Sequence, residues 1–451
     1  MIISEIRYNQ IVEKLRFDAE FYKPEYLEAE EIVKKFPHTK PLGELTTSII
    51  NGVDIREFVP IGISYLRVGD MKEIFIDIDN SRKVRVTSNI KKEIKLKEGD
   101  LLFARKGTIG ITCIVTDDLK DAVISTELIK VRLKEVNPYY VAVFFNSKYG
   151  RKQLLKISSG AVNPVITRDL FESVFVLIPP LSFQQKIELL VKEAYKNRKE
   201  ADEKYKQAEF LLNKALGIEK LELKDEMTFE TRFDEIESGQ RFDADFYLPK
   251  YTEVLKVLKK SEFELKKLKE VCKETIRRIN PIEKPSEKFT YIEIGDVDIS
   301  TGEIEVKSIL GYEAPPNARR FLKKGDLVIS MVRPTRGAIT IIPDELDNSL
   351  ASTAFYILEI ESPIREFLFV YLRSPLGLNQ LGRPVVGAMY PTLKKDYIEK
   401  IIVPIIPEET QKQISNLIKQ SFALRKESKE LLEKAKKEVE GFIEKNKNQN
   451  P

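Results

Sequence analysis

The residue types that enzymes use for hydrolysis, metal binding or group transfer are sparse in this sequence. It has one histidine, His38, and two cysteines, Cys113 and Cys272, which stand outside any C-x-x-C pair. Without clustered ligands and without a Ser-His-Asp order, we expect neither a zinc site nor a hydrolytic triad. There is also no G-x-x-x-x-G-K-[ST] phosphate loop. The sequence therefore predicts no catalytic residue, no metal site and no cofactor.

One short stretch, NPYY at Asn137 to Tyr140, approaches the Asn/Asp-Pro-Pro-aromatic loop that adenine methyltransferases need for a flipped base. It lacks the second proline, and the related stretch later in the chain begins Ser362-Pro363-Ile364. Asn or Ser followed by Pro is also the pattern of a helix start, with a capping side chain and then Pro at the first helical position. We interpret both stretches as helix starts, with Asn137 and Ser362 as caps.

Basic and amide side chains that follow turns are the remaining candidates for a function, and these residue types are the ones that proteins use to contact nucleic acid. Arg and Lys contact phosphates, whereas Arg, Asn and Gln read base edges in the major groove. An ion-paired surface position is an equally good interpretation for each residue alone. The candidates are Asn51, Arg56, Arg67, Arg105, Lys106, Thr108, Asn163 and Arg168 in the first half of the chain, and Arg277, Arg278, Asn280, Arg319, Arg320, Arg333, Arg336, Tyr390 and Lys394 in the second.

The elements that carry these residues are written twice. RFDAEFY at Arg16 to Tyr22 returns as RFDADFY at Arg241 to Tyr247, and further matches follow at offsets of 225 to 227. They pair KEGDLLFAR with KKGDLVISM, and SGAVNPVITRDLFESVFVLIPP with VGAMYPTLKKDYIEKIIVPIIP. This period is far above the roughly 20–50 residues of solenoid repeats, so each copy is a module of domain size. The arginine and aspartate of each RFDA segment are interpreted as a local salt bridge that docks the lead-in helix.

Each copy is expected to contain a mixed domain of strands, turns and short helices, followed by one long helix. Ser182 and Gln185 form a capping-box pattern for the first long helix, and Gly217 is a stop signal. Positions at alternating spacings of three and four predict a pairing seam. The residues expected to pair the helices are Ile187, Leu190, Ala194, Ala201, Ala208 and Leu211 in the first helix and Ile414, Leu417, Leu424, Leu431 and Ala435 in the second. Asn197, Lys204, Ser421 and Ser428 are polar seam positions.

These patterns give an α+β, mixed fold: two tandem α/β domains separated by two long helices that form an antiparallel coiled coil with a pseudo-two-fold relation. The predicted boundaries are 1–180 and 218–406 for the two domains, 181–217 and 407–446 for the two helices, and 447–451 for a tail. At 451 residues the chain exceeds the usual size of one domain. No stretch resembles a signal peptide or a membrane span, and the two isolated cysteines favour a cytoplasmic location without membrane association. The net charge of +4 is too small to indicate nucleic-acid binding by itself.

The order of these motifs resembles the specificity subunit of type I restriction-modification systems. The resemblance rests on the two RFDA segments, GDLLFAR and GDLVISM, SGAVNPVITRDL and GAMYPTLKKDYI, and the helix starts IPPLSFQQKI and VPIIPEETQKQI. It implies a non-catalytic subunit whose two domains are target recognition domains for the halves of a bipartite target in double-stranded DNA. It also implies that the helices set the gap between the halves. The implied partners are two adenine-N6 methyltransferase subunits and an ATP-dependent endonuclease and translocase subunit.

Two other classes of protein compete with this interpretation. A duplicated scaffold that binds only protein partners would show the same repeat, and steep salt dependence of DNA binding would separate it from a DNA reader. A fused methyltransferase is the enzyme alternative, and the incomplete NPYY loop argues against it.

Overall fold

The structure is a computed structural model that describes residues 11, 16–79, 81–85, 94–160, 164–219, 221, 223, 226, 228–385 and 391–447. The chain forms two compact units. Unit 1 contains residues 1–199 and 424–451, and unit 2 contains residues 200–423. Within the described ranges, no helix combines the length and apolar character needed to cross a membrane.

Unit 1 is built on a four-stranded antiparallel sheet in the order β2-β8-β5-β6. A second sheet, β4-β3-β7, combines an antiparallel pair with the parallel pair β3 and β7. The small sheets β1-β11 and β9-β10 close the unit. The strands are β1 (Thr39–Pro41), β2 (Thr46–Asn51), β3 (Ile63–Leu66), β4 (Arg82–Val84), β5 (Leu101–Ala104), β6 (Thr112–Ile114), β7 (Val123–Ile124), β8 (Leu128–Leu133), β9 (Ser158–Ser159), β10 (Val165–Ile166) and β11 (Phe175–Leu177).

Unit 2 repeats the order of the main sheet, and its second sheet has one strand more. Its main sheet is β13-β20-β17-β18, its second sheet is β15-β14-β19-β16 with β14 and β19 parallel, and β12 pairs with β21. The strands are β12 (Glu264–Lys267), β13 (Lys273–Glu274), β14 (Lys288–Ile292), β15 (Lys307–Leu310), β16 (Ala318–Phe321), β17 (Leu327–Ser330), β18 (Ile339–Ile341), β19 (Leu350–Ser352), β20 (Phe355–Glu359) and β21 (Ile402–Ile405). The predicted duplication of a mixed α/β module is therefore confirmed at the level of topology.

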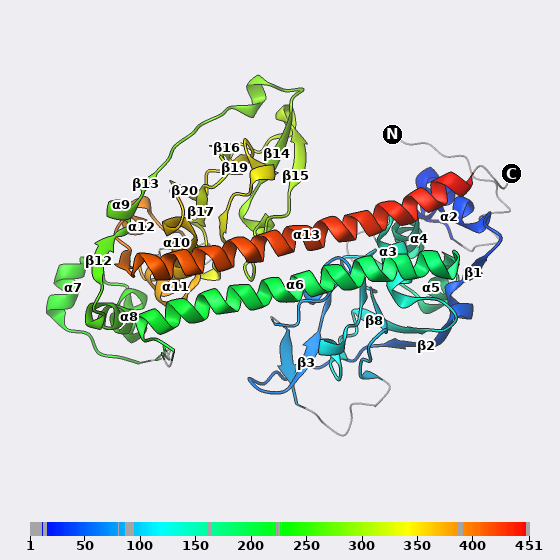
Figure 1. Ribbon diagram of the computed structural model, residues 1–451, viewed down its shortest axis with the longest axis horizontal. Helices are drawn as coiled ribbons and strands as arrows, with labels where there is room; N and C mark the ends of the chain where they lie inside the picture. The colour runs from blue at the N-terminus through cyan, green and yellow to red at the C-terminus, as the bar shows by residue number, and fades with distance from the viewer. Residues whose placement is uncertain are drawn as a thin grey trace. The chain divides into compact units, whose positions relative to one another are not determined.

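Short helices accompany the sheets of both units (Figure 1). In unit 1, α3 and α4 pack against each other, and α4 also packs against α2. Unit 2 has the corresponding pair α10 and α11, with α11 packed on α8. The helices are α2 (Pro24–Lys34), α3 (Pro138–Asn146), α4 (Lys148–Ile157) and α5 (Arg168–Glu172) in unit 1, and α7 (Phe233–Gly239), α8 (Pro249–Lys260), α9 (Leu268–Val271), α10 (Ile364–Arg373), α11 (Pro375–Gly382) and α12 (Lys395–Ile398) in unit 2.

Two long helices complete the fold, α6 (Leu181–Leu216) and α13 (Glu408–Lys447). In each unit a segment of α6 packs antiparallel to a segment of α13 (Figure 1). In unit 1 the hydroxyl of Ser428 donates to the carbonyl oxygen of Ala194 at 2.7 Å. In unit 2 the hydroxyl of Ser421 donates to the carbonyl oxygen of Ala201 at 2.8 Å. Buried alanines and serines let the two helix backbones approach closely enough for these bonds.

The seam follows a register that differs from the expected one at alternate positions. Of the residues expected to pair the helices, Ile187, Leu190, Ala194, Ala201, Ala208, Ile414 and Ala435 are buried. Leu211, Leu417, Leu424 and Leu431 are only partly buried, whereas their neighbours Leu212, Ile418, Arg425 and Leu432 are buried. Of the two polar positions expected in the first helix, Asn197 is buried as expected. Lys204 is only partly buried, and its neighbour Tyr205 is buried in its place.

The helix ends test four predictions of capping. Asn137 caps α3 as predicted, because its side-chain oxygen accepts hydrogen bonds from the backbone N–H groups of Tyr139 and Tyr140. Gly217 ends α6 as predicted, with a positive φ of 65°. The Ser182 cap is wrong, because α6 already begins at Leu181 after Pro180. The Ser362 cap is also wrong, because α10 begins at Ile364 and Pro363 holds the cap position.

Candidate nucleic-acid interface

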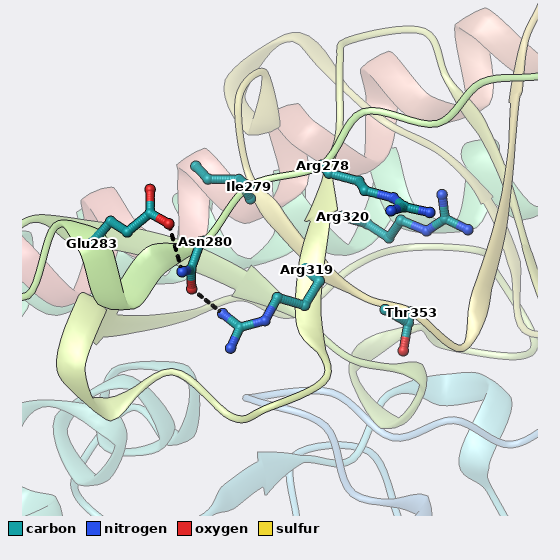
Figure 2. A pocket seen from close by; sticks show the side chains of 7 residues that line it. All are labelled: Arg278, Ile279, Asn280, Glu283, Arg319, Arg320 and Thr353. Carbon is teal, nitrogen blue, oxygen red and sulfur yellow. Dashed lines mark hydrogen bonds between the residues drawn. The ribbon is translucent and has the colours of Figure 1, made fainter.

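An arginine-rich hollow opens on the second sheet of unit 2 (Figure 2). Its volume is about 570 Å³. Three of the arginines predicted from the sequence, Arg278, Arg319 and Arg320, line it. The other lining residues are Ile279, Asn280, Glu283 and Thr353. The fold thus brings together basic residues that lie about forty positions apart in the chain.

Strand geometry places the three arginines. Arg278 pairs with Arg320 in an isolated antiparallel bridge, so their side chains leave the sheet on the same face. Figure 2 shows the two guanidinium groups extending in the same direction. The pairing of β16 with β19 shifts register between Ala318 and Arg320, and such a bulge redirects a side chain. This irregularity explains why the consecutive residues Arg319 and Arg320 both line the hollow.

The hydrogen bonds of the hollow use only some of its guanidinium donors. Arg319 donates through Nη1 to Oδ1 of Asn280 at 2.7 Å, and Nδ2 of Asn280 donates to Oε1 of Glu283 at 2.7 Å. Arg320 donates through Nη2 to Oε1 of Glu274 at 3.4 Å, while its buried Nη1 has no hydrogen-bond partner. Guanidinium donors in an open basic hollow are suited to phosphate oxygens or base edges.

Arg277 lies one residue before this cluster and has a different environment. Its Nη1 donates to Asp326 and its Nη2 to Glu359, both at 2.7 Å. The equivalent aspartate of unit 1, Asp100, is held in the same manner by Arg132 at 2.7 Å. Burial raises the pKa of Asp326, and the arginine beside it partly offsets this effect. Arg277 is thus part of an ion-pair network that joins the main sheet to the turn before β17.

Further candidates in unit 2 lie where the chain beyond β17 meets the segment before α12. The backbone N–H of Arg333 donates to the carbonyl oxygen of Pro391 at 2.8 Å, and Val332 pairs with Thr392. Arg333 has a left-handed backbone with φ of 48°. Arg336 and Lys394 are exposed on these segments. Tyr390 lies outside the described residues.

In unit 1, the chain just after β5 meets β10, as the equivalent two segments of unit 2 meet each other. Lys106, just after β5, pairs with Val165 of β10, and Nε of Arg105 donates to the carbonyl oxygen of Ile166 at 3.3 Å. Lys106 and Thr108 are exposed. Arg168 begins α5 and forms an ion pair with Glu172 at 2.7 Å, while Asn163 lies outside the described residues.

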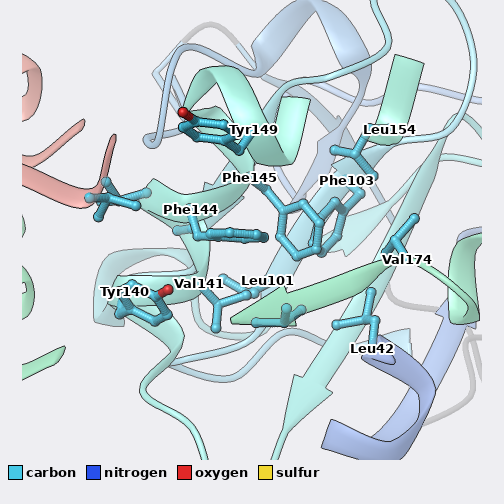
Figure 3. Close-up of a cluster of buried hydrophobic side chains, with 14 of the residues drawn as sticks. Leu42, Leu101, Phe103, Tyr140, Val141, Phe144, Phe145, Tyr149, Leu154 and Val174 are labelled. Carbon is cyan, nitrogen blue, oxygen red and sulfur yellow. The ribbon is translucent and has the colours of Figure 1, made fainter. Parts of the chain in front are cut away.

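A rigid core supports this part of unit 1 (Figure 3). Phe103 lies on β5, two residues before Arg105, and is almost completely buried. Its ring contacts those of Phe145 and Phe171 edge to face, with centroids 5.1 and 4.9 Å apart. Such pairs add to the stabilisation from buried apolar area. The basic loop after β5 therefore starts from a fixed strand end.

The other candidates of unit 1 lie between the end of β2 and the turn after β3. Asn51 is the exposed last residue of β2, and the exposed Arg56 pairs with Asp54 at 3.0 Å. Nε of Arg67, after β3, lies 3.9 Å from Asp70 and has no hydrogen-bond partner. Burial raises the pKa of Asp70, whose carboxylate also accepts from the backbone N–H of Arg67 at 2.8 Å.

Equivalent positions of the two units share backbone contacts but differ in side chain. The N–H groups of Arg67 and Glu293 donate to Asp70 and Asp296 at 2.8 and 2.9 Å. In the same way Arg105 and Met331 are equivalent. Their N–H groups donate to the backbone carbonyl oxygens of Glu127 and Ala354 at 2.7 and 2.9 Å. Their own carbonyl oxygens accept from the N–H groups of Ile166 and Leu393 at 3.0 and 2.8 Å. One scaffold thus presents arginine in unit 1 and glutamate or methionine in unit 2.

The RFDA segments also take the same structure twice. Arg16 donates to both carboxylate oxygens of Asp18 at 2.6 and 2.7 Å, and Arg241 does so to Asp243 at 2.7 and 2.6 Å. Each arginine also donates to a distant backbone carbonyl, that of Ser158 at 3.2 Å in unit 1 and that of Pro384 at 3.0 Å in unit 2. The predicted local salt bridge is present in both copies.

Sequence reasoning missed two contributors to these surfaces. Thr353 follows β19 directly and lines the hollow of unit 2. Its position just after a predicted strand could have identified it from the sequence. In unit 1, the guanidinium of Arg82 lies over the ring of Phe58, with its carbon 4.3 Å from the centroid. Among the described residues, no cluster of His, Cys, Asp and Glu could hold a metal ion.

Comparisons with known proteins show which proteins this chain is similar to. Residues 56–202 and 260–437, well over half of the chain, match the model of the type I restriction modification DNA specificity domain. The MjaVIII type I restriction enzyme specificity subunit of Methanocaldococcus jannaschii is 23% identical over 372 residues, covering 80% of this chain and 81% of that protein. The HindI specificity subunit of Haemophilus influenzae is 29% identical over 132 residues, which cover 27% and 29% of the two chains. The crystal structure of a type I S subunit from M. genitalium aligns over 89% of this chain and 95% of its own, with 12% identity and a TM-score of 0.44.

Proposed function

The chain belongs to the family of type I restriction-modification DNA specificity proteins, and from this premise we propose that each unit reads one half of a divided target in double-stranded DNA. The chain is the DNA specificity subunit of such a system, and this subunit is non-catalytic. The two matched regions, 56–202 and 260–437, are one for each copy of the repeat.

The observation that carries the proposal is the pair of equivalent positions with different side chains. A backbone that is hydrogen-bonded alike in both units offers Arg67 and Arg105 in one and Glu293 and Met331 in the other. Sequence is read by side chains at base edges, whereas phosphate contacts fix position. Two scaffolds of one design with different side chains are therefore suited to reading two different half-sites.

In unit 2, the arginine-rich hollow is the proposed DNA contact, with Arg278, Arg319 and Arg320 as donors. In unit 1, the proposed contact is the loop after β5, with Arg105 and Lys106, together with Arg67. Asn51, Arg56, Arg168, Arg333, Arg336 and Lys394 are exposed or partly exposed and belong to the same proposal at the edges of these surfaces.

The proposed partners are two methyltransferase subunits and an endonuclease and translocase subunit. The chemistry of methylation and cleavage would then belong to those subunits, and this chain would direct them to a sequence.

We further propose that the paired helices set the gap between the half-sites. At about 1.5 Å per residue, the 36 residues of α6 span about 54 Å, longer than the ~34–36 Å of one turn of DNA. Inserting seven residues into each helix, between the Ala194–Ser428 and Ala201–Ser421 contacts, keeps the heptad pattern and adds about 10 Å. The preferred gap should lengthen while both half-sites stay the same. An unchanged gap in a folded protein would contradict this role.

A salt titration tests the DNA function itself. Purified chain, mixed with its methyltransferase subunits, should bind duplexes that carry the target with an affinity that falls steeply as salt rises. The expected slope of log K against log salt is about −0.9 for each phosphate contact. A duplicated scaffold without DNA specificity would show neither the slope nor a preference among sequences.

A further inference from the structure

Each RFDA segment exposes one aromatic ring to solvent. Phe17 is 81% exposed and its counterpart Phe242 is 89% exposed. Large apolar side chains are normally withdrawn from water when the fold offers a place for them. The same ring is left outside in both copies of the repeat, so its exposure is a property of the segment.

The backbone that carries each ring is held firmly. Arg16 and Arg241 clamp the aspartate two positions later and stack on Phe21 and Phe246, with guanidinium carbons 4.9 and 4.8 Å from the ring centroids. The hydroxyl groups of Tyr22 and Tyr247 donate to the carbonyl oxygens of the same arginines at 3.1 and 2.8 Å. A ring presented from such a fixed segment loses little conformational freedom on binding, as a binding anchor requires.

The charge of the segment that carries Phe242 disfavours DNA as the occupant and favours a basic protein surface. Residues 228–247 contain six carboxylates and two arginines, Arg232 and Arg241, and both arginines are paired with a neighbouring aspartate. Within this stretch, Phe233 on α7 is also exposed, and α7 buries none of its residues. A negative rim repels phosphates but complements lysine and arginine.

Unit 2 has an apolar hollow beside its RFDA segment. It measures about 220 Å³, its apolar lining includes Phe246, Leu255 and Ile401, and its charged lining residues are Arg383 and Lys400. Phe246 lies four residues after Phe242 in the same segment. An exposed aromatic anchor on an acidic segment, with an apolar hollow beside it, has the anatomy of a protein docking site.

We propose that Phe17 and Phe242 are equivalent docking anchors, each of which inserts into an apolar pocket rimmed by lysine and arginine on one copy of a protein partner. Two anchors on two copies of the repeat accept two partner molecules. The occupant to which we commit is the methyltransferase subunit, so the inference rests on the proposed function and locates one contact of that assembly.

The test uses the full chain and the purified methyltransferase subunit of the same system. Native mass spectrometry and titration should show two partner molecules on the wild-type chain. Phe17→Ala and Phe242→Ala should each weaken one of the two binding steps by about 10- to 100-fold, as expected for the loss of one buried aromatic anchor. Asp245→Lys should weaken the step at unit 2 and should do so most at low salt.

Matched controls are Ile61→Ala and Tyr312→Ala, which remove side chains that are 92% and 63% exposed outside the RFDA segments. Both should bind two partners as the wild type does. Circular dichroism and sequence-specific DNA binding by the phenylalanine variants should stay unchanged.

If the variant that carries both Phe17→Ala and Phe242→Ala bound two partner molecules as tightly as the wild type, the inference would be overturned. Retained DNA specificity in that variant would show that the proposed function still stands. Loss of DNA specificity with partner binding intact would overturn it as well, because the rings would then belong to the DNA surface. If the wild-type chain bound no methyltransferase subunit, the inference and the proposed partner would fall together.

Discussion

Arg319 donates a hydrogen bond through Nη1 to the side-chain oxygen of Asn280 at 2.7 Å. This bond ties β16 to the turn before β14 and holds the guanidinium at the rim of the arginine-rich hollow. Its remaining donors are available to a ligand because Asn280 accepts only one of them. A guanidinium fixed by one bond and open at the others is preorganised for a phosphate or a base edge.

Replacing the hollow's arginines should lower both the affinity for DNA and its dependence on salt. Each of the variants Arg278→Ala, Arg319→Ala and Arg320→Ala should reduce the slope of log K against log salt by about 0.9, the value of one phosphate contact. Fluorescence anisotropy with a labelled duplex at several salt concentrations measures the affinity and its slope. Lys260→Ala, at the end of α8, removes an equal charge outside the hollow and should leave the slope unchanged. A wild-type slope in all three arginine variants would remove the hollow from the interface.

Arg105→Met should alter the half-site that is read by unit 1 and leave the other half intact. Unit 2 carries methionine at the equivalent position with the same backbone hydrogen bonds, so the scaffold should accept the change. If Arg105 contacts a base, its loss should cost about 1–3 kcal/mol of discrimination at one position. Sequencing of duplexes selected by the wild type and by the variant would show it. Identical selections would place Arg105 away from base edges.

Overpacking the helix seam should destabilise the fold. Ala201 is fully buried, and its carbonyl oxygen accepts a bond from Ser421. Ala201→Leu would separate the helices and should lower the free energy of unfolding by about 1–3 kcal/mol. Lys196→Leu on the exposed face of α6 is the control and should change it by less than about 0.5 kcal/mol. Unfolding of both variants in denaturant measures their free energies of unfolding. An Ala201→Leu variant as stable as the wild type would argue against close packing at Ala201.

The RFDA salt bridges should make stability fall in acid. The hydrogen bond from Arg16 holds the pKa of Asp18 below its usual value, and Arg241 does the same for Asp243. A carboxyl with a lowered pKa stabilises the fold above its unfolded pKa, and this contribution is lost as the pH falls through the folded pKa. Asp18→Asn combined with Asp243→Asn should therefore lower Tm at pH 7 and converge with the wild type in acid. Asp169→Asn, on the exposed start of α5, should show no such convergence.

Strand alternation and a bulge limited what the sequence could tell about the arginines. Arg277 and Arg278 are neighbours in a basic run, yet one pairs with Asp326 and Glu359 while the other lines the hollow. Arg319 and Arg320 both line it only because β16 is irregular. A run of basic residues identifies such a region, but only strand pairing decides which guanidinium is available.

The helix seam shows a second limit. The duplication and the two long helices follow directly from repeated motifs and periodic spacing. The register does not, because buried polar residues contribute to it. Ser421, Ser428 and Arg425 are buried on α13, and the serines bond to carbonyl oxygens of α6. The expected spacing reaches both serines, but between them it selects the partly exposed Leu424 where Arg425 is buried, and after them Leu431 where Leu432 is buried.

Selection of bound duplexes from a random library tests the central claim most directly. The wild-type chain with its methyltransferase subunits should select two short specific sequences separated by an unspecific gap of fixed length. Replacing residues 56–180 by the equivalent segment of another family member should change one of the two sequences only. Selection of a single continuous site, of both halves changed at once, or of no sequence at all would contradict the account.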